Sequence, residues 1–115
     1  MTGISSITKK ILAFREARDW RQFHNPKDIA LSLVLEATEV LEHFQWKNGD
    51  DIQKHVDANK DKISEELADV LYWLILMSHD LNIDLLESLS KKLEINEKKY
   101  PVDKAKGTSK KYTEL

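Results

Sequence analysis

The stretch ELADVLYWLILM, residues 66–77, decides the fold, because as a helix it carries apolar side chains around almost its whole circumference. A helix of this kind is buried on all sides, and a chain of 115 residues would struggle to enclose it alone. Asp69 interrupts the stretch, which is shorter than the ~20 residues of a membrane span. The sequence therefore predicts a helical protein that associates with copies of itself.

Helical spacing and helix-end signals extend this interpretation over the whole chain. Helices are predicted over about residues 5–19, 25–46, 63–81 and 84–100. Asn25-Pro26 supplies an N-cap and a first helical residue, and Asp84 with Glu87 has the spacing of a capping box. The polar residues 50–62 are expected to form a loop or a short helical turn. The fold class is thus all-α, with four main helices.

Composition narrows the function further. The 115 residues suit one domain, taken as a helical domain over residues 1–101 followed by a Lys-rich tail over residues 102–115. The net charge of −2 provides no basic field for a nucleic acid polymer, so none is expected as a partner. No Cys is present, and neither a membrane segment nor a secretory signal is visible. We therefore expect a cytoplasmic protein.

Four carboxylates are set in two pairs within apolar runs. Glu36 and Glu39 are three residues apart, as are Glu66 and Asp69, so each pair lies on one helix face. Carboxylates gathered at an apolar site need a counterion, and oxygen ligands without His or Cys suit Mg²⁺ or Mn²⁺. The pattern favours metal-assisted phosphoryl transfer, although solvated carboxylates on charged helices explain it equally well.

A di-iron centre is a rival use of carboxylates in a helical bundle, and it requires Glu-x-x-His motifs. The chain has four histidines, none of which follows a Glu by three residues: His24, His43, His55 and His79. The spacing therefore argues against di-iron chemistry.

Longer motifs add a resemblance to a known family. Glu36-Ala-Thr-Glu39 followed by Glu65-Glu66-Leu-Ala-Asp69 resembles the metal-binding pattern of MazG-like nucleoside triphosphate pyrophosphohydrolases. Further motifs resemble the dCTP pyrophosphatase branch: Arg18-Asp-Trp-Arg-Gln-Phe-His24, Phe44-Gln-Trp46, Ile95-Asn-Glu-Lys-Lys-Tyr-Pro101 and Lys110-Lys-Tyr-Thr-Glu-Leu115. The similarity runs from about Phe14 to the C-terminus.

The resemblance implies hydrolysis of a (deoxy)nucleoside triphosphate, with dCTP or a modified dCTP the leading substrate, to the monophosphate and pyrophosphate by an Mg²⁺-activated water. It implies a MazG-like fold in which dimerisation completes four-helix bundles, and a homo-oligomer that is a dimer or a tetramer built from two dimers. The metal ligands would be Glu36, Glu39, Glu66 and Asp69, and Glu36 or Glu39 would act as the base. Mn²⁺ remains an alternative metal.

Most candidate substrate-binding residues lie in the same motifs, and Trp73 and Lys92 lie outside them. Trp20 and Trp46 offer flat faces for stacking on a base, which contributes roughly 1–3 kcal/mol, and Asn96 suits the edge of a cytosine. Trp73 stands where the branch tends to carry Tyr, so base or sugar preference could differ. The remaining candidates, for sugar or phosphate contacts, are His24, Lys92, Lys99, Lys110 and Lys111.

Two non-catalytic functions compete with the enzyme. One is a helical dimerisation module, which predicts no stabilisation by metal. The other is a nucleotide-binding sensor without turnover, which predicts stabilisation by nucleotide and no product. The complete set of four carboxylates favours the enzyme over both.

Overall fold

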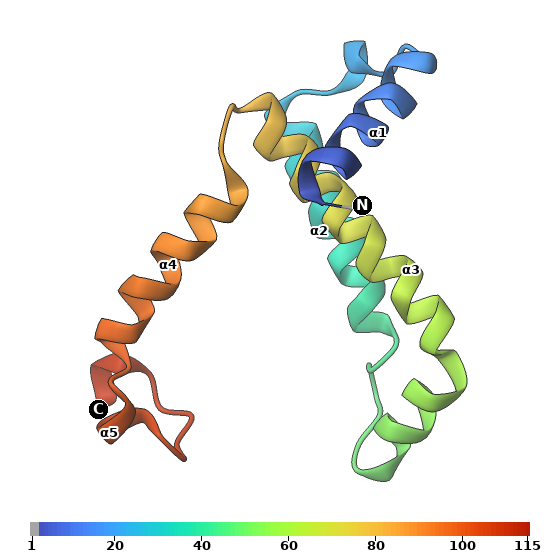
Figure 1. Ribbon diagram of the computed structural model, residues 1–115. Helices are drawn as coiled ribbons and strands as arrows, with labels where there is room; N and C mark the ends of the chain where they lie inside the picture. Colours follow the sequence, from blue (N-terminus) through green and yellow to red (C-terminus); the bar gives the residue numbers. More distant parts are fainter. Residues whose placement is uncertain (1–2) are drawn as a thin grey trace. The chain divides into compact units, whose positions relative to one another are not determined.

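The computed structural model describes residues 3–115, and every regular element within them is helical (Figure 1). The long helices are α1 (Ile4–Ala17), α2 (Pro26–Glu42), α3 (Asp50–Asp80) and α4 (Leu85–Lys99), and the short elements are η1 (Arg21–Phe23), α5 (Val102–Ala105) and η2 (Tyr112–Glu114). The prediction of an all-α fold with four main helices is confirmed. The described residues form two compact units, residues 3–82 and residues 83–115.

The first unit is built on an antiparallel hairpin of α2 and α3, with α1 packed against α3 (Figure 1). The start of α2 follows the sequence signals, because Asn25 Oδ1 accepts a hydrogen bond of 2.9 Å from the Asp28 amide and Pro26 is the first helical residue. The buried apolar side chains of this first unit, among its described residues, are Ile29, Ile75 and Leu76. Such a small core leaves much of the apolar surface of the unit uncovered.

The apolar face of α3 is an instance. Leu67 and Leu71 are 54% and 48% exposed. The composition of the helix predicts burial on all sides, but one chain alone leaves these two side chains uncovered. Leu31, Val34 and Leu35 on α2 are also exposed. Exposed apolar side chains in this number are typical of a surface that another layer of protein covers.

The connection between α2 and α3 differs from the sequence prediction. Residues 50–62 are helical and continue into the rest of α3, with one interruption at Asn59, where φ is −128° and ψ is 23°. The segment contains neither Gly nor Pro, and Asp50 and Asp51 lie favourably in its first turn, so a polar composition alone does not prevent a helix. The second helix ends at Glu42, earlier than the predicted Trp46, and residues 43–46 form turns.

The second unit contains α4, α5 and η2. Asp84 caps α4 as predicted, by accepting a hydrogen bond of 3.1 Å from the Glu87 amide. Residues after Pro101 fold back on the end of α4, since the Tyr112 ring lies edge-on to Tyr100 at 6.0 Å and 4.7 Å from Lys99 Nζ. Over residues 3–115, no helix is both long enough and apolar enough to cross a lipid bilayer.

Candidate metal and nucleotide site

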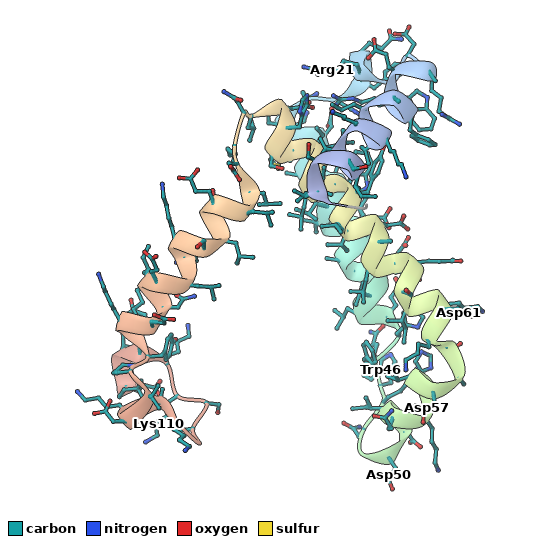
Figure 2. All side chains as sticks on the ribbon, viewed as in Figure 1. Arg21, Trp46, Asp50, Asp57, Asp61 and Lys110 are labelled. Atoms are coloured by element: carbon teal, nitrogen blue, oxygen red, sulfur yellow. The ribbon has the colours of Figure 1, made fainter. Side chains whose placement is uncertain are left out.

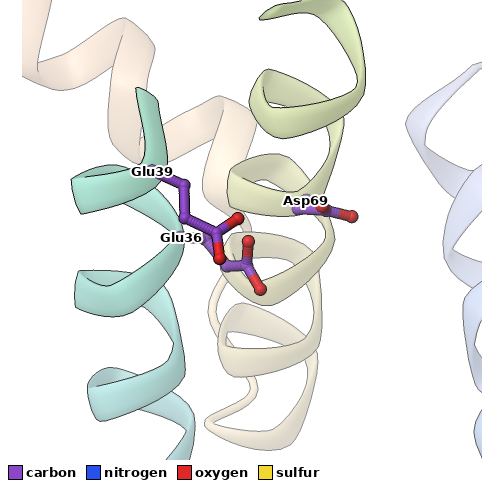
Figure 3. Close-up of side chains that lie close together, drawn as sticks. All are labelled: Glu36, Glu39 and Asp69. Carbon is purple, nitrogen blue, oxygen red and sulfur yellow. The ribbon is translucent and has the colours of Figure 1, made fainter. Parts of the chain in front are cut away.

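Three of the four predicted ligands come together between α2 and α3. Glu36 and Glu39 extend from α2 towards α3, which carries Asp69 (Figure 3). One carboxylate oxygen of each residue lies within 4.8 Å of the corresponding oxygens of the other two. The i,i+3 spacing within α2 and the hairpin pairing of the two helices together produce this cluster.

Glu36 lies in an unfavourable environment for a charged carboxylate. Its Oε2 is buried and has no hydrogen-bond partner among the described residues. Desolvation raises the pKa of Glu36, and the neighbouring charges of Glu39, Asp69 and Glu66 raise that pKa further. A cation would offset both costs, and an all-oxygen set of carboxylates is the kind that Mg²⁺ and Mn²⁺ prefer. These residues therefore fit a divalent metal.

Glu66, the fourth predicted ligand, lies one turn before Asp69 on α3 and has a different partner. Its Oε2 contacts Nε2 of His43, the residue that follows the end of α2. Glu66 and His43 line a cavity of about 240 Å³, together with Glu39, Glu42 and His55. Glu66 thus shares a cavity with one member of the carboxylate cluster, Glu39, while a histidine holds its carboxylate.

A larger pocket of about 520 Å³ opens beside the other side of the cluster. Its lining residues are Ile7, Lys10, Ile11, Phe14, Trp20, Glu36, Asp69, Tyr72 and Trp73. Most of this lining is apolar or aromatic, and the two carboxylates lie at the same pocket. Such a combination suits a ligand with a flat apolar part joined to a group that binds metal.

His24 is placed next to this pocket without lining it. Its ring meets Trp73 edge-on, with the ring centroids 5.4 Å apart, and Arg15 Nη1 lies 3.4 Å from His24 Nδ1. Because a guanidinium only donates, Nδ1 accepts and the ring proton belongs on Nε2. Desolvation and the nearby charge of Arg15 lower the pKa of His24, which favours this neutral ring.

The other predicted substrate contacts are Trp46 and five residues of the second unit. Trp46 lies in the connection between α2 and α3 and is 90% exposed, with a left-handed φ of 68° (Figure 2). It does not line the pocket that contains Trp20 and Trp73. The other five candidates belong to the second unit: Lys92, Asn96, Lys99, Lys110 and Lys111.

Several residues that line the two cavities were not predicted as site residues from the sequence. Phe14, Lys10 and Tyr72 line the large pocket, although only the i,i+3 and i,i+4 spacing of Ile7, Ile11 and Phe14 hinted at a shared face. His43 and His55 lie beside the carboxylates because α3 begins at residue 50, which the prediction of a loop over residues 50–62 concealed.

Comparison with known proteins places these residues in a family context. The MazG-like family matches residues 31–115, a range that includes all four carboxylates. The chain is 38% identical over 114 residues to dCTP pyrophosphatase 1 of Homo sapiens and 36% identical to dCTP pyrophosphatase 1 of Mus musculus. Each of these alignments covers 97% of this chain and 67% of the relative.

A solved structure agrees with the sequence comparison. The crystal structure of a pyrophosphatase from Archaeoglobus fulgidus superimposes with a TM-score of 0.84 and 33% sequence identity, covering 88% of this chain and 94% of the archaeal chain. The resemblance noted in the sequence is thereby confirmed. The chain belongs to the MazG-like family.

Proposed function

We propose that this protein is a metal-dependent nucleoside triphosphate pyrophosphohydrolase that converts dCTP, or a base-modified dCTP, to the monophosphate and pyrophosphate. The observation that carries the proposal is the cluster of Glu36, Glu39 and Asp69 at the edge of an aromatic pocket. The names of the relatives, dCTP pyrophosphatase 1 and an archaeal pyrophosphatase, support the same reaction.

The proposed metal ligands are Glu36, Glu39 and Asp69, joined by Glu66. Mg²⁺ bound there would neutralise charge on the triphosphate and lower the pKa of water. Glu36 or Glu39 would accept the proton of the attacking water. The unpartnered Oε2 of Glu36 and the raised pKa of its carboxyl suit either role, because both create a demand for a positive charge or a proton.

The aromatic pocket is the proposed site of the nucleoside. Trp20 and Trp73 would pack against the base or sugar, and stacking of a base on an aromatic ring contributes roughly 1–3 kcal/mol. His24, with its Nε2–H, would donate to the sugar or a phosphate. Trp46, Asn96, Lys92, Lys99, Lys110 and Lys111 remain proposed substrate contacts, the last two supplied by the tail over residues 102–115.

We also propose a homo-oligomer in which a second copy of the chain completes the helical bundles. The exposed Leu67 and Leu71 on α3 support it, as does the small buried apolar core among residues 3–82, formed by Ile29, Ile75 and Leu76. Sedimentation analysis tests this proposal, with a dimer or tetramer expected. A monomer at micromolar concentration would contradict it.

The proposed reaction is tested by pyrophosphate release from a panel of deoxy- and ribonucleoside triphosphates, with Mg²⁺ and with EDTA. We expect the highest kcat/KM with dCTP or a 5-modified dCTP and no release in EDTA. Equal rates with purine and pyrimidine triphosphates would remove the proposed base preference but leave the reaction class intact. Stabilisation by nucleotide without any product would instead favour the nucleotide-binding module.

A further inference from the structure

A chain of polar contacts leads away from Glu66 on the side that faces the smaller cavity. His43 Nε2 contacts Glu66 Oε2, and the other ring nitrogen of His43, Nδ1, lies 2.8 Å from His55 Nε2. His55 Nδ1 in turn lies 3.3 Å from Asn59 Nδ2. These contacts join the end of α2 to two positions on α3, on either side of the interruption at Asn59.

The direction of the hydrogen bonds among Asn59, His55 and His43 follows from one backbone carbonyl. Asn59 Nδ2 lies 3.0 Å from the His55 carbonyl oxygen, which only accepts, so this atom is the amide nitrogen and donates. His55 Nδ1 therefore accepts the second Asn59 proton, and His55 Nε2–H donates to His43 Nδ1. His43 must then carry its proton on Nε2, where it meets the Glu66 carboxylate.

The contact between His43 and Glu66 is buried, which limits the orientations that the Glu66 carboxylate can adopt. Glu66 Oε2 and His43 Nε2 are both buried, and neither forms a hydrogen bond with a described residue, so their ion contact with each other is the polar interaction available to them. Glu66 Oε1 makes no hydrogen bond there and is absent from the buried unpartnered atoms, so it remains accessible. Desolvation and the nearby Lys47 and His43 lower the pKa of His55, in keeping with a neutral His55 ring that relays a single proton orientation.

We propose that His43, His55 and Asn59 form a positioning relay that fixes one oxygen of Glu66 and leaves the other free to bind the metal. The inference rests on the proposed function, since it requires Glu66 to be a metal ligand. A Glu side chain has several rotatable bonds, and holding one oxygen removes much of the conformational freedom that metal binding would otherwise have to remove. Outer partners of metal ligands act in this way in other proteins.

The test is Mn²⁺ binding by the full chain without nucleotide, measured from the electron paramagnetic resonance signal of free Mn²⁺. We expect His43→Leu to weaken Mn²⁺ binding by roughly 10–100-fold, the usual effect of removing an outer partner. His55→Leu acts one contact further away and should cost on the order of threefold to tenfold. In steady-state assays both variants should raise the Mg²⁺ concentration for half-maximal activity more than the KM for nucleotide.

Two further variants separate positioning from a general structural effect. His55→Gln keeps a side-chain N–H near the place of Nε2 and should bind Mn²⁺ within about twofold of wild type, while His55→Leu should not. His79→Leu makes the same substitution at an exposed histidine of α3 and should leave binding unchanged. If His43→Leu fails to fold, the contrast between the two His55 variants still decides the question.

Glu66→Gln makes the failure of the relay distinguishable from the failure of the metal site. If Glu66→Gln weakens Mn²⁺ binding while folded His43→Leu and His55→Leu bind like wild type, the relay is overturned and the metal site stands. Equal losses in His55→Leu and His55→Gln also overturn the relay. If Glu66→Gln binds Mn²⁺ as tightly as wild type, Glu66 is not a ligand, and the relay falls together with that part of the proposed function.

Discussion

Arg15 and Asp80 form a bidentate ion pair that joins α1 to the last residue of α3, with nitrogen–oxygen distances of 2.8 and 2.9 Å. The Arg15 side chain is 2% exposed and that of Asp80 11% exposed, so water screens the pair little. Arg15 also contacts His24, which meets Trp73 at the large pocket. The ion pair therefore connects the packing of α1 to one wall of the proposed nucleotide site.

Asp80→Asn should destabilise the fold strongly, because it leaves a buried guanidinium without its counter-charge. Loss of one partner from a buried ion pair costs about 3–5 kcal/mol, and urea unfolding at fixed protein concentration measures it. The exposed pair Lys91–Glu87, at 2.9 Å, supplies the control. Lys91→Met should cost under ~1 kcal/mol, and equal losses in the two variants would contradict the importance of burial.

The pH dependence of stability should carry the signature of Asp80. The hydrogen bond and charge of Arg15 hold the pKa of Asp80 below its usual value of 3.8. The stabilising effect of the charged carboxylate is therefore complete above about pH 4 and is lost as the pH falls through the depressed native pKa. Subtracting the Asp80→Asn unfolding curve from the wild-type curve should reveal this loss. A difference that stays constant from pH 5 to pH 2 would contradict it.

Glu36→Gln should separate stability from metal binding. Because burial and neighbouring carboxylates raise the pKa of Glu36, its charged form destabilises the metal-free fold at neutral pH. The variant should therefore unfold at a higher temperature than wild type in EDTA, and it should lose most of the stabilisation that Mg²⁺ gives to wild type. A lower melting temperature in EDTA would show that the Glu36 charge has a partner within the protein.

A substitution at Trp46 tests substrate binding without a large change in the stability of the fold. Its side chain is 90% exposed, so Trp46→Ala should change the free energy of unfolding by at most about 0.5 kcal/mol. As a proposed base contact it should nonetheless raise the KM for dCTP, by roughly 5- to 150-fold for a stacking energy of about 1–3 kcal/mol. An unchanged KM would exclude Trp46 from the substrate site.

Trp20→Ala is the companion experiment at the pocket itself. Trp20 packs edge-on against Phe14 at 5.7 Å, so the variant should lose some stability as well as affinity for dCTP. Nucleotide binding measured by calorimetry with Ca²⁺ in place of Mg²⁺ isolates the second effect. Unaltered affinity in folded Trp20→Ala would place the nucleoside outside this pocket.

The sequence predicted the starts of two helices correctly, because each start depends on one capping side chain. Asn25 caps α2 and Asp84 caps α4, as the sequence predicts, because a cap depends on residues only three positions away. Residues 50–62 were assigned wrongly as a loop or short turn. Their polar side chains lack an apolar stripe, but a helix without Gly or Pro needs no such stripe when it extends a longer, packed helix.

The candidate site was predictable only in part, because sequence signals are local and some of its contacts join distant residues. Helix periodicity places Glu36 beside Glu39, and the pairing of α2 with α3 adds Asp69. The partner of Glu66 was not predictable, because the predicted second helix ran past His43 to Trp46 and the segment that holds His55 was predicted to be a loop or a short helical turn. The Arg15–Asp80 pair spans 65 residues, a separation for which one sequence holds no local signal.

The most direct test of the central claim is the identity of the products that wild type and Glu39→Gln form from dCTP with Mg²⁺, resolved by ³¹P nuclear magnetic resonance. Wild type should yield dCMP and pyrophosphate in equal amounts and nothing in EDTA, and Glu39→Gln should be slower by at least about 100-fold, as expected for loss of a general base. Formation of dCDP and phosphate, or a folded Glu39→Gln variant with the wild-type rate, would contradict a pyrophosphohydrolase whose chemistry depends on the clustered carboxylates of α2 and α3.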